Sequence, residues 1–145
     1  MLFRTLTLLT ITLCFCHLSQ ATEAVQVDYM LNCQGCHLPD GSGFPRRNVP
    51  AIKNHMGKFL SVEGGRDYLI QVPGSAQSDL PDKELTQLIN WMLLTFSPTE
   101  IPKDFIPYSV NEVSELRKFP LINVAEVRQT LLERISNYEK QPTAN

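Results

Sequence analysis

The feature that most constrains this chain is a pair of cysteines three positions apart with a histidine directly after the second, Cys33-Gln34-Gly35-Cys36-His37. Four kinds of site use such a pair: a redox-active dithiol, half of a zinc site, a structural disulfide, or an attachment point for a larger group. The compartment in which the chain works, and its remaining cysteines and histidines, distinguish among the four.

The N-terminus has the layout of a secretory signal peptide. Arg4 supplies a positive start, residues 6–15 are apolar except for threonines, and Ser19-Gln20-Ala21 is a small-x-small cleavage site. The apolar run is short for a membrane span. We therefore predict cleavage after Ala21 and a periplasmic protein with no stable membrane insertion; a retained membrane anchor is the alternative.

Removal of this segment changes the cysteine count. Cys14 and Cys16 leave with it, so the chain keeps two of its four cysteines, too few for a disulfide framework. A zinc site would need two further ligands, and His37 and His55 are the histidines left. No strongly β-patterned run precedes the motif, as a thioredoxin-like site would require.

The motif does match the attachment signature of c-type haem. Each thiol adds to one vinyl group, so the two sulfurs lie a fixed distance apart along one edge of the macrocycle, and the next residue can ligate the iron. We predict one covalent haem c held by Cys33 and Cys36, with His37 as the proximal ligand. Export agrees, because the attachment machinery works outside the cytoplasm. A chance match in a protein with a plain disulfide is the alternative.

The predicted mature chain is small and mildly acidic. It keeps 12 basic and 15 acidic residues, a net charge of −3, because Arg4 is the only charged residue before Thr22. Its 124 residues (145 minus 21) allow one domain with a modest core. Nothing in this charge pattern indicates a nucleic-acid partner or an anionic membrane surface.

Hydrophobic periodicity predicts an all-α fold. A short helix is expected over residues 22–33, followed by a Gly/Pro-rich loop over 38–58 and a second short helix over 66–72 that Pro73-Gly74 ends. A longer helix follows, with Asp82 as its N-cap and Phe96 as its last apolar position.

From about residue 24 to 96 the sequence resembles the single-haem class I c-type cytochromes. The resemblance implies that the helix ending in CxxCH is crossed by the last helix of the domain, where Trp91 would pack on Tyr29. It also implies that the carbonyl of Pro50 accepts a hydrogen bond from the proximal His37 imidazole.

The chain departs from this family on the distal side of the haem. The family usually carries a methionine just ahead of the last helix, but residues 73–84 (PGSAQSDLPDKE) contain neither methionine nor histidine. Met56, 19 residues after His37, is the distal ligand that we predict; His55, water or an open position are the alternatives. Met92 lies on an apolar stripe and is assigned to the core.

Arginines are candidates for pairing with the haem propionates. Arg66, at the start of the second helix, is assigned to this role, and Arg46 and Arg47 in the loop are further candidates for it or for docking a partner. Solvated side chains are the alternative for all three.

The remaining segment lies outside the resemblance. We predict a signal peptide at 1–21, a cytochrome c domain at 22–97, and a proline-rich connector with C-terminal helices at 98–145. The two helices are expected near 110–118 and 124–139, with capping boxes beginning at Ser109 and Asn123. We expect a helical hairpin that clasps the domain; a docking arm for a partner is the alternative.

The resemblance implies a periplasmic electron carrier and not an enzyme. Its partner would be another redox protein, and by analogy a periplasmic dehydrogenase or terminal acceptor. The alternative is a haem protein with an open distal site that binds a small ligand or peroxide, in which His55 would serve as the distal acid–base group.

Overall fold

The computed structural model describes residues 23–140, and the predicted signal peptide with Cys14 and Cys16 lies outside them. Within the described residues the chain is helical and has no strand, only an isolated bridge between Phe44 and Val49. This confirms the predicted all-α fold. In the same part of the chain, no helix has the length and apolar character needed to cross a membrane.

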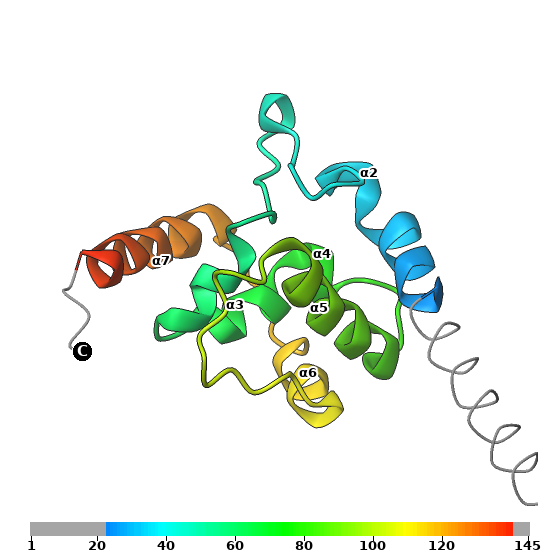
Figure 1. Ribbon diagram of the computed structural model, residues 1–145. Helices are drawn as coiled ribbons and strands as arrows, with labels where there is room; N and C mark the ends of the chain where they lie inside the picture. The colour runs from blue at the N-terminus through cyan, green and yellow to red at the C-terminus, as the bar shows by residue number, and fades with distance from the viewer. Residues whose placement is uncertain (1–22, 141–145) are drawn as a thin grey trace, which may run out of the picture.

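The helices follow the predicted order (Figure 1). They are an N-terminal helix over residues 23–32, α2 (Gln34–His37), the 3-10 helices η1 (Pro45–Arg47) and η2 (Met56–Ser61), α3 (Gly65–Gln71), α4 (Pro73–Ala76), α5 (Asp82–Phe96), α6 (Val110–Leu116) and α7 (Val124–Glu139). The 3-10 helices η1 and η2, within and just after the predicted 38–58 loop, were not predicted. Nor was the short helix α4. It begins at Pro73, because proline has no N–H to lose at the first position of a helix and so ends α3 while starting the next turn.

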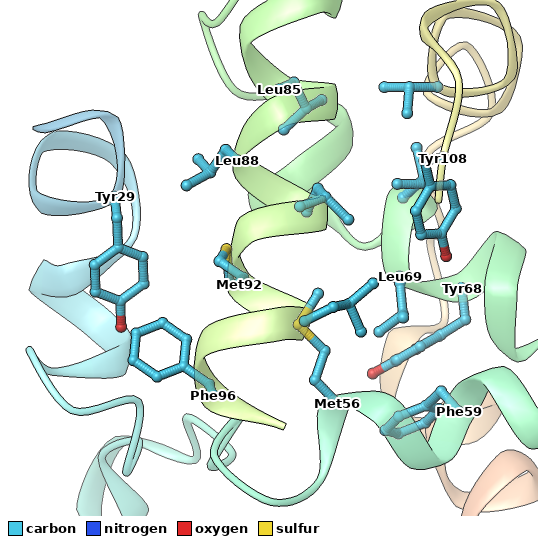
Figure 2. Close-up of a cluster of buried hydrophobic side chains, with 14 of the residues drawn as sticks. Tyr29, Met56, Phe59, Tyr68, Leu69, Leu85, Leu88, Met92, Phe96 and Tyr108 are labelled. Atoms are coloured by element: carbon cyan, nitrogen blue, oxygen red, sulfur yellow. The ribbon is translucent and has the colours of Figure 1, made fainter. Parts of the chain in front are cut away.

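An aromatic cluster joins the N-terminal helix to α5. Tyr29 is 2% exposed, and its ring centroid lies 5.6 Å from that of Trp91 and 5.0 Å from that of Phe96. The Tyr29 hydroxyl donates to the carbonyl of Leu38, at 2.6 Å. Figure 2 shows Tyr29 facing Phe96 from the neighbouring helix. The predicted contact between Tyr29 and Trp91 is confirmed, and it fixes the segment that carries the cysteines against α5.

The two C-terminal helices contact different parts of the body. Helix α6 packs on α5 and α3, whereas α7 packs on η2 and α3, and the two lie well apart in Figure 1. Val113 of α6 is 0% exposed, and Leu131 and Ile135 of α7 are buried. Each helix therefore buries apolar side chains against the domain.

Of the two predicted capping boxes, one is confirmed and one is wrong. The Ser109 hydroxyl accepts from the Glu112 N–H at 3.2 Å, and the Glu112 carboxylate accepts from the Ser109 N–H at 3.4 Å. The Asn123 side chain makes no capping hydrogen bond; only its backbone carbonyl participates, accepting from Val127.

The segment before α5 is held by an arginine from beyond the predicted cytochrome region. The Arg117 guanidinium donates to the carbonyls of Ala76, Ser78 and Leu80, at 3.3, 2.6 and 2.8 Å. It also donates to the Asp82 carboxylate at 2.8 Å. The predicted N-cap at Asp82 is therefore wrong: Pro81 occupies that position, and Asp82 is the first helical residue with its carboxylate turned to Arg117.

Candidate functional site

The described residues enclose a cavity of about 530 Å³ next to the CxxCH segment. Its walls come from α2, the loop over residues 48–52, η2, α3, α4, α5 and α7. Most lining side chains are apolar, and the volume is in the range of about 300–1,000 Å³ that is usual for cofactor sites. The lining includes five residues discussed below: Cys36, His37, Pro50, Met56 and Met92.

Of the two cysteines, Cys36 lines this space directly. Cys33 lines a smaller adjoining cavity of about 130 Å³, which Cys36 and His37 also line. Both thiols are free, and Cys33 is partly buried whereas Cys36 is exposed. The N–H groups of Cys36 and His37 donate to the Cys33 carbonyl at 3.1 and 2.9 Å, which brings the three side chains together in one tight turn.

The Cys33 thiol does not have the character of a reactive redox thiol. Burial raises its pKa to about 11, and the nearby Cys36 and Asp28 contribute to this rise. Redox-active CxxC motifs lower the thiol pKa instead, since the thiolate is the nucleophile. The raised pKa of Cys33 is the opposite of what a redox-active thiol needs.

The imidazole of His37 is oriented by a backbone carbonyl. Its Nδ1 lies 3.2 Å from the carbonyl oxygen of Pro50, the contact that the family resemblance implied. Because a carbonyl can only accept, Nδ1 carries the hydrogen and Nε2 keeps its lone pair. Burial lowers the His37 pKa and outweighs the opposing effect of the Pro50 hydrogen bond, which favours the neutral imidazole that a metal ion requires.

A glycine allows the loop to approach closely enough for this contact. Gly43 has a φ of +75°, and a Cβ built there would lie 2.6 Å from the backbone of Pro50 and Ala51. Its N–H donates to the His37 carbonyl at 3.1 Å. A residue with a side chain would have to push Pro50 away from the imidazole.

Met56 is buried and lines the cavity that His37 lines. It is 4% exposed and is the first residue of η2, with its N–H donating to the Ile52 carbonyl at 2.9 Å. The next residue anchors it, because the Gly57 N–H donates to the buried Ser97 hydroxyl at 2.9 Å. Figure 2 shows the Met56 side chain reaching up beside α5, with Leu69 and the Tyr68 hydroxyl nearby. His55 is exposed and not among the cavity's lining residues; its Nδ1 lies 2.7 Å from the Lys53 carbonyl.

Met92 is a second methionine of the cavity, which the sequence analysis assigned only to the core. It is 5% exposed and lines both the main cavity and the smaller one at the cysteines. The core assignment is correct as far as burial goes. Ile89, one turn earlier on α5, lines the same two cavities, so the helical stripe that predicted the core also marked this wall.

The arginine assigned to the haem propionates is not brought to this cavity. The Arg66 guanidinium lies over the Tyr108 ring, 4.0 Å from its centroid, and pairs with both carboxylate oxygens of Glu112, the Nη2–Oε2 distance being 2.9 Å. Arg46 and Arg47 are exposed on η1 and do not line it either. The arginine that does line it is Arg128 of α7, which the sequence analysis did not identify.

These residues fit a covalently held haem. An oriented imidazole, the free thiol of Cys36 and two methionine thioethers line a largely apolar cavity, and the free thiol of Cys33 lines the small cavity that adjoins it. A metal centre made only of protein ligands has less support, since no group of three or more His, Cys, Asp or Glu side chains suited to a metal ion occurs among residues 23–140.

Comparison with known proteins decides the family. The chain is 30% identical over 103 residues to a cytochrome c-552 of Thermus thermophilus, in an alignment that covers 59% of this chain and 78% of that protein. The chain belongs to the c-type cytochromes. A second cytochrome c-552 of the same species is also 30% identical over 103 residues, covering 59% of this cytochrome and 69% of the relative. No family model and no solved structure matches the chain.

Membership confirms the cofactor and the broad function predicted from the motif. Like its relatives, this cytochrome carries covalently bound haem c and transfers electrons. Family membership alone does not establish the number of haems, the axial ligands or the redox partner.

Proposed function

We propose that this c-type cytochrome is an exported electron carrier with one haem, attached through Cys33 and Cys36 and ligated on the proximal side by His37. The observation that carries the proposal is the His37–Pro50 hydrogen bond, 3.2 Å long, beside a cavity that both the imidazole and the Cys36 thiol line. One CxxCH motif is present in the whole sequence, which supports a single haem.

The protein's own residues orient the His37 ligand and bury the haem in an apolar cavity. When bound, haem supplies a one-electron couple between ferric and ferrous iron. The Pro50 carbonyl holds the His37 ring at a fixed angle and increases the basicity of its free nitrogen. Apolar walls at Ile89 and Leu69 exclude water, which disfavours the extra positive charge of the ferric state.

On the distal side we propose Met56 as the sixth ligand. Its burial and its place in the cavity wall support it, and a thioether is a soft ligand that favours ferrous iron. Met92 has the same chemistry and lines the same cavity, and is the competitor. The peroxide-binding alternative required a distal histidine, and His55 is not among the lining residues.

Location and partner follow from the sequence and remain part of the proposal. The N-terminal pattern supports export to the periplasm, where haem is attached. A carrier with no substrate machinery of its own exchanges electrons with another redox protein, and we propose a periplasmic dehydrogenase or terminal acceptor. The exposed Arg46 and Arg47 are candidates for contact with an acidic partner surface.

Spectroscopy of two matched variants tests the distal assignment. The wild type should be low-spin in both oxidation states, and Met56→Ala should become high-spin with a lower midpoint potential. Met92→Ala should remain low-spin, because it removes a thioether that is not the proposed iron ligand and leaves Met56 in place. The converse pattern would assign the ligand to Met92. A high-spin wild type would contradict methionine ligation and favour the ligand-binding alternative.

A further inference from the structure

Three adjoining cavities run across the domain, from the cysteines to helix α7. The small cavity at Cys33 shares Cys36 and His37 with the main cavity. The main cavity in turn shares Tyr68 and Arg128 with a third, more open cavity of about 600 Å³ between the loop and α7. Cys33 lines only the small cavity, whereas Arg128 lines only the other two.

If the proposed attachment is correct, the chemistry of haem determines which of these cavities the propionates face. The two vinyl groups of haem lie on one side of the macrocycle and the two propionates on the other. Thioether bonds to Cys33 and Cys36 would fix the vinyl side at the cysteine end. The propionates would then extend away from the cysteines, toward the wall that α7 contributes through Val124 and Arg128.

The side chains at that wall suit a carboxylate. Among the described residues that line the main cavity, Arg128 is the only lysine or arginine. Tyr68 lines it as well; its ring stacks on Phe59 at 5.0 Å, and its hydroxyl points toward the Met56 side chain in Figure 2. Burial raises the Tyr68 pKa, against the effect of the nearby Arg128 charge. The hydroxyl therefore stays protonated and can donate a hydrogen bond.

Helix α7, which carries Arg128, is anchored to the domain by buried side chains and polar contacts. Leu131 and Ile135 are 3% and 5% exposed where α7 packs on the domain. Farther along, Arg134 donates to the Glu63 carbonyl and Lys58 pairs with Glu139, both at 2.8 Å. The helix is thus fixed to the body over residues 131–139, and Arg128, one turn before Leu131, lines the cavity.

We propose that Arg128 is the counter-charge of the haem propionates, with the Tyr68 hydroxyl as a second donor, so that the C-terminal helix completes the haem site. The role predicted for Arg66 passes to Arg128, because the Arg66 guanidinium is committed to Glu112. The C-terminal extension thereby acts on the redox centre and does more than stabilise the fold.

Redox titration of the holoprotein tests this role. Reduction lowers the positive charge of the iron by one. A cation near the propionates therefore favours the reduced state. Arg128→Gln should therefore shift the midpoint potential to more negative values, and Arg128→Lys should recover most of the shift. Lys140→Gln is the matched control: it removes a positive charge at the exposed C-terminal end of the same helix, at a residue that does not line the cavity.

The outcomes separate this inference from the proposed function. The mass of each denatured variant reports first whether haem is attached; a chain without haem would overturn the proposed function and this inference with it. With haem attached, equal shifts for Arg128→Gln and Lys140→Gln, or no shift for either, would overturn the Arg128 assignment alone. A smaller negative shift for Tyr68→Phe, with an unchanged thermal midpoint, would support the second donor.

Discussion

Replacing Arg117 by glutamine should destabilise the domain through the segment before α5. Arg117 donates to three backbone carbonyls there, at Ala76, Ser78 and Leu80, and its side chain is 16% exposed. A hydrogen bond from a charged donor contributes about 1.5–3 kcal/mol when buried. Water can replace part of each bond at this partly open site, so we expect a total loss of about 2–4 kcal/mol.

Thermal unfolding followed by circular dichroism measures this loss. A domain of this size loses about 4 °C in Tm per kcal/mol, which gives a fall of about 8–16 °C for Arg117→Gln. Lys118→Gln is the neighbouring control: its pair with Glu115 is 53% and 70% exposed, and its loss should stay within about 0.5 kcal/mol. Arg117→Lys should restore only part of the stability, because one ammonium group cannot reach three carbonyls. If Arg117→Gln melts within about 2 °C of Lys118→Gln, the segment is held by something else.

Two further predictions concern acid stability and the loop. The hydrogen bonds from Arg66 depress the Glu112 pKa, so their stabilisation is fully present above the ordinary carboxyl pKa and is lost as pH falls through the depressed value. Glu112→Gln should flatten the acid side of a stability–pH curve, and a curve as steep as the wild type would contradict the pairing. Gly43→Ala should lower the free energy of unfolding by more than the about 1–3 kcal/mol of backbone strain at its φ of +75°, because its Cβ would also clash with Pro50. It should disturb the haem spectrum as well. Gly64→Ala, with a similar φ of +80° but nothing nearer than 3.9 Å to the added Cβ, should lose less stability, and equal losses in chemical denaturation would refute the loop argument.

The sequence was most informative where the structure is set by local pattern. The CxxCH motif predicted the cofactor, since five consecutive residues carry the whole attachment chemistry. Helix α5 was predicted from its apolar periodicity and the Tyr29–Trp91 contact from the family resemblance; the structure confirms both.

The errors arose where long-range contacts decide the outcome. Asp82 was expected to cap α5, but Arg117, 35 residues later in the chain, draws its carboxylate away. Arg66 was assigned to the haem, but Glu112 from α6 pairs with it. Arg128 was not identified, because the side of α7 that faces the cavity depends on how the helix packs on η2 and α3. Periodicity predicts that a helix has an apolar side, but not which surface of the domain that side will contact.

The mass of the intact, denatured holoprotein tests the central claim most directly. The protein should be expressed with its N-terminal segment in a host that attaches haem in the periplasm. The account predicts a chain that begins at Thr22 and carries one haem that acid-acetone extraction does not remove, and a bare chain for the Cys33→Ala, Cys36→Ala double variant. A wild-type mass without haem, or haem released by the extraction, would contradict covalent attachment at Cys33 and Cys36.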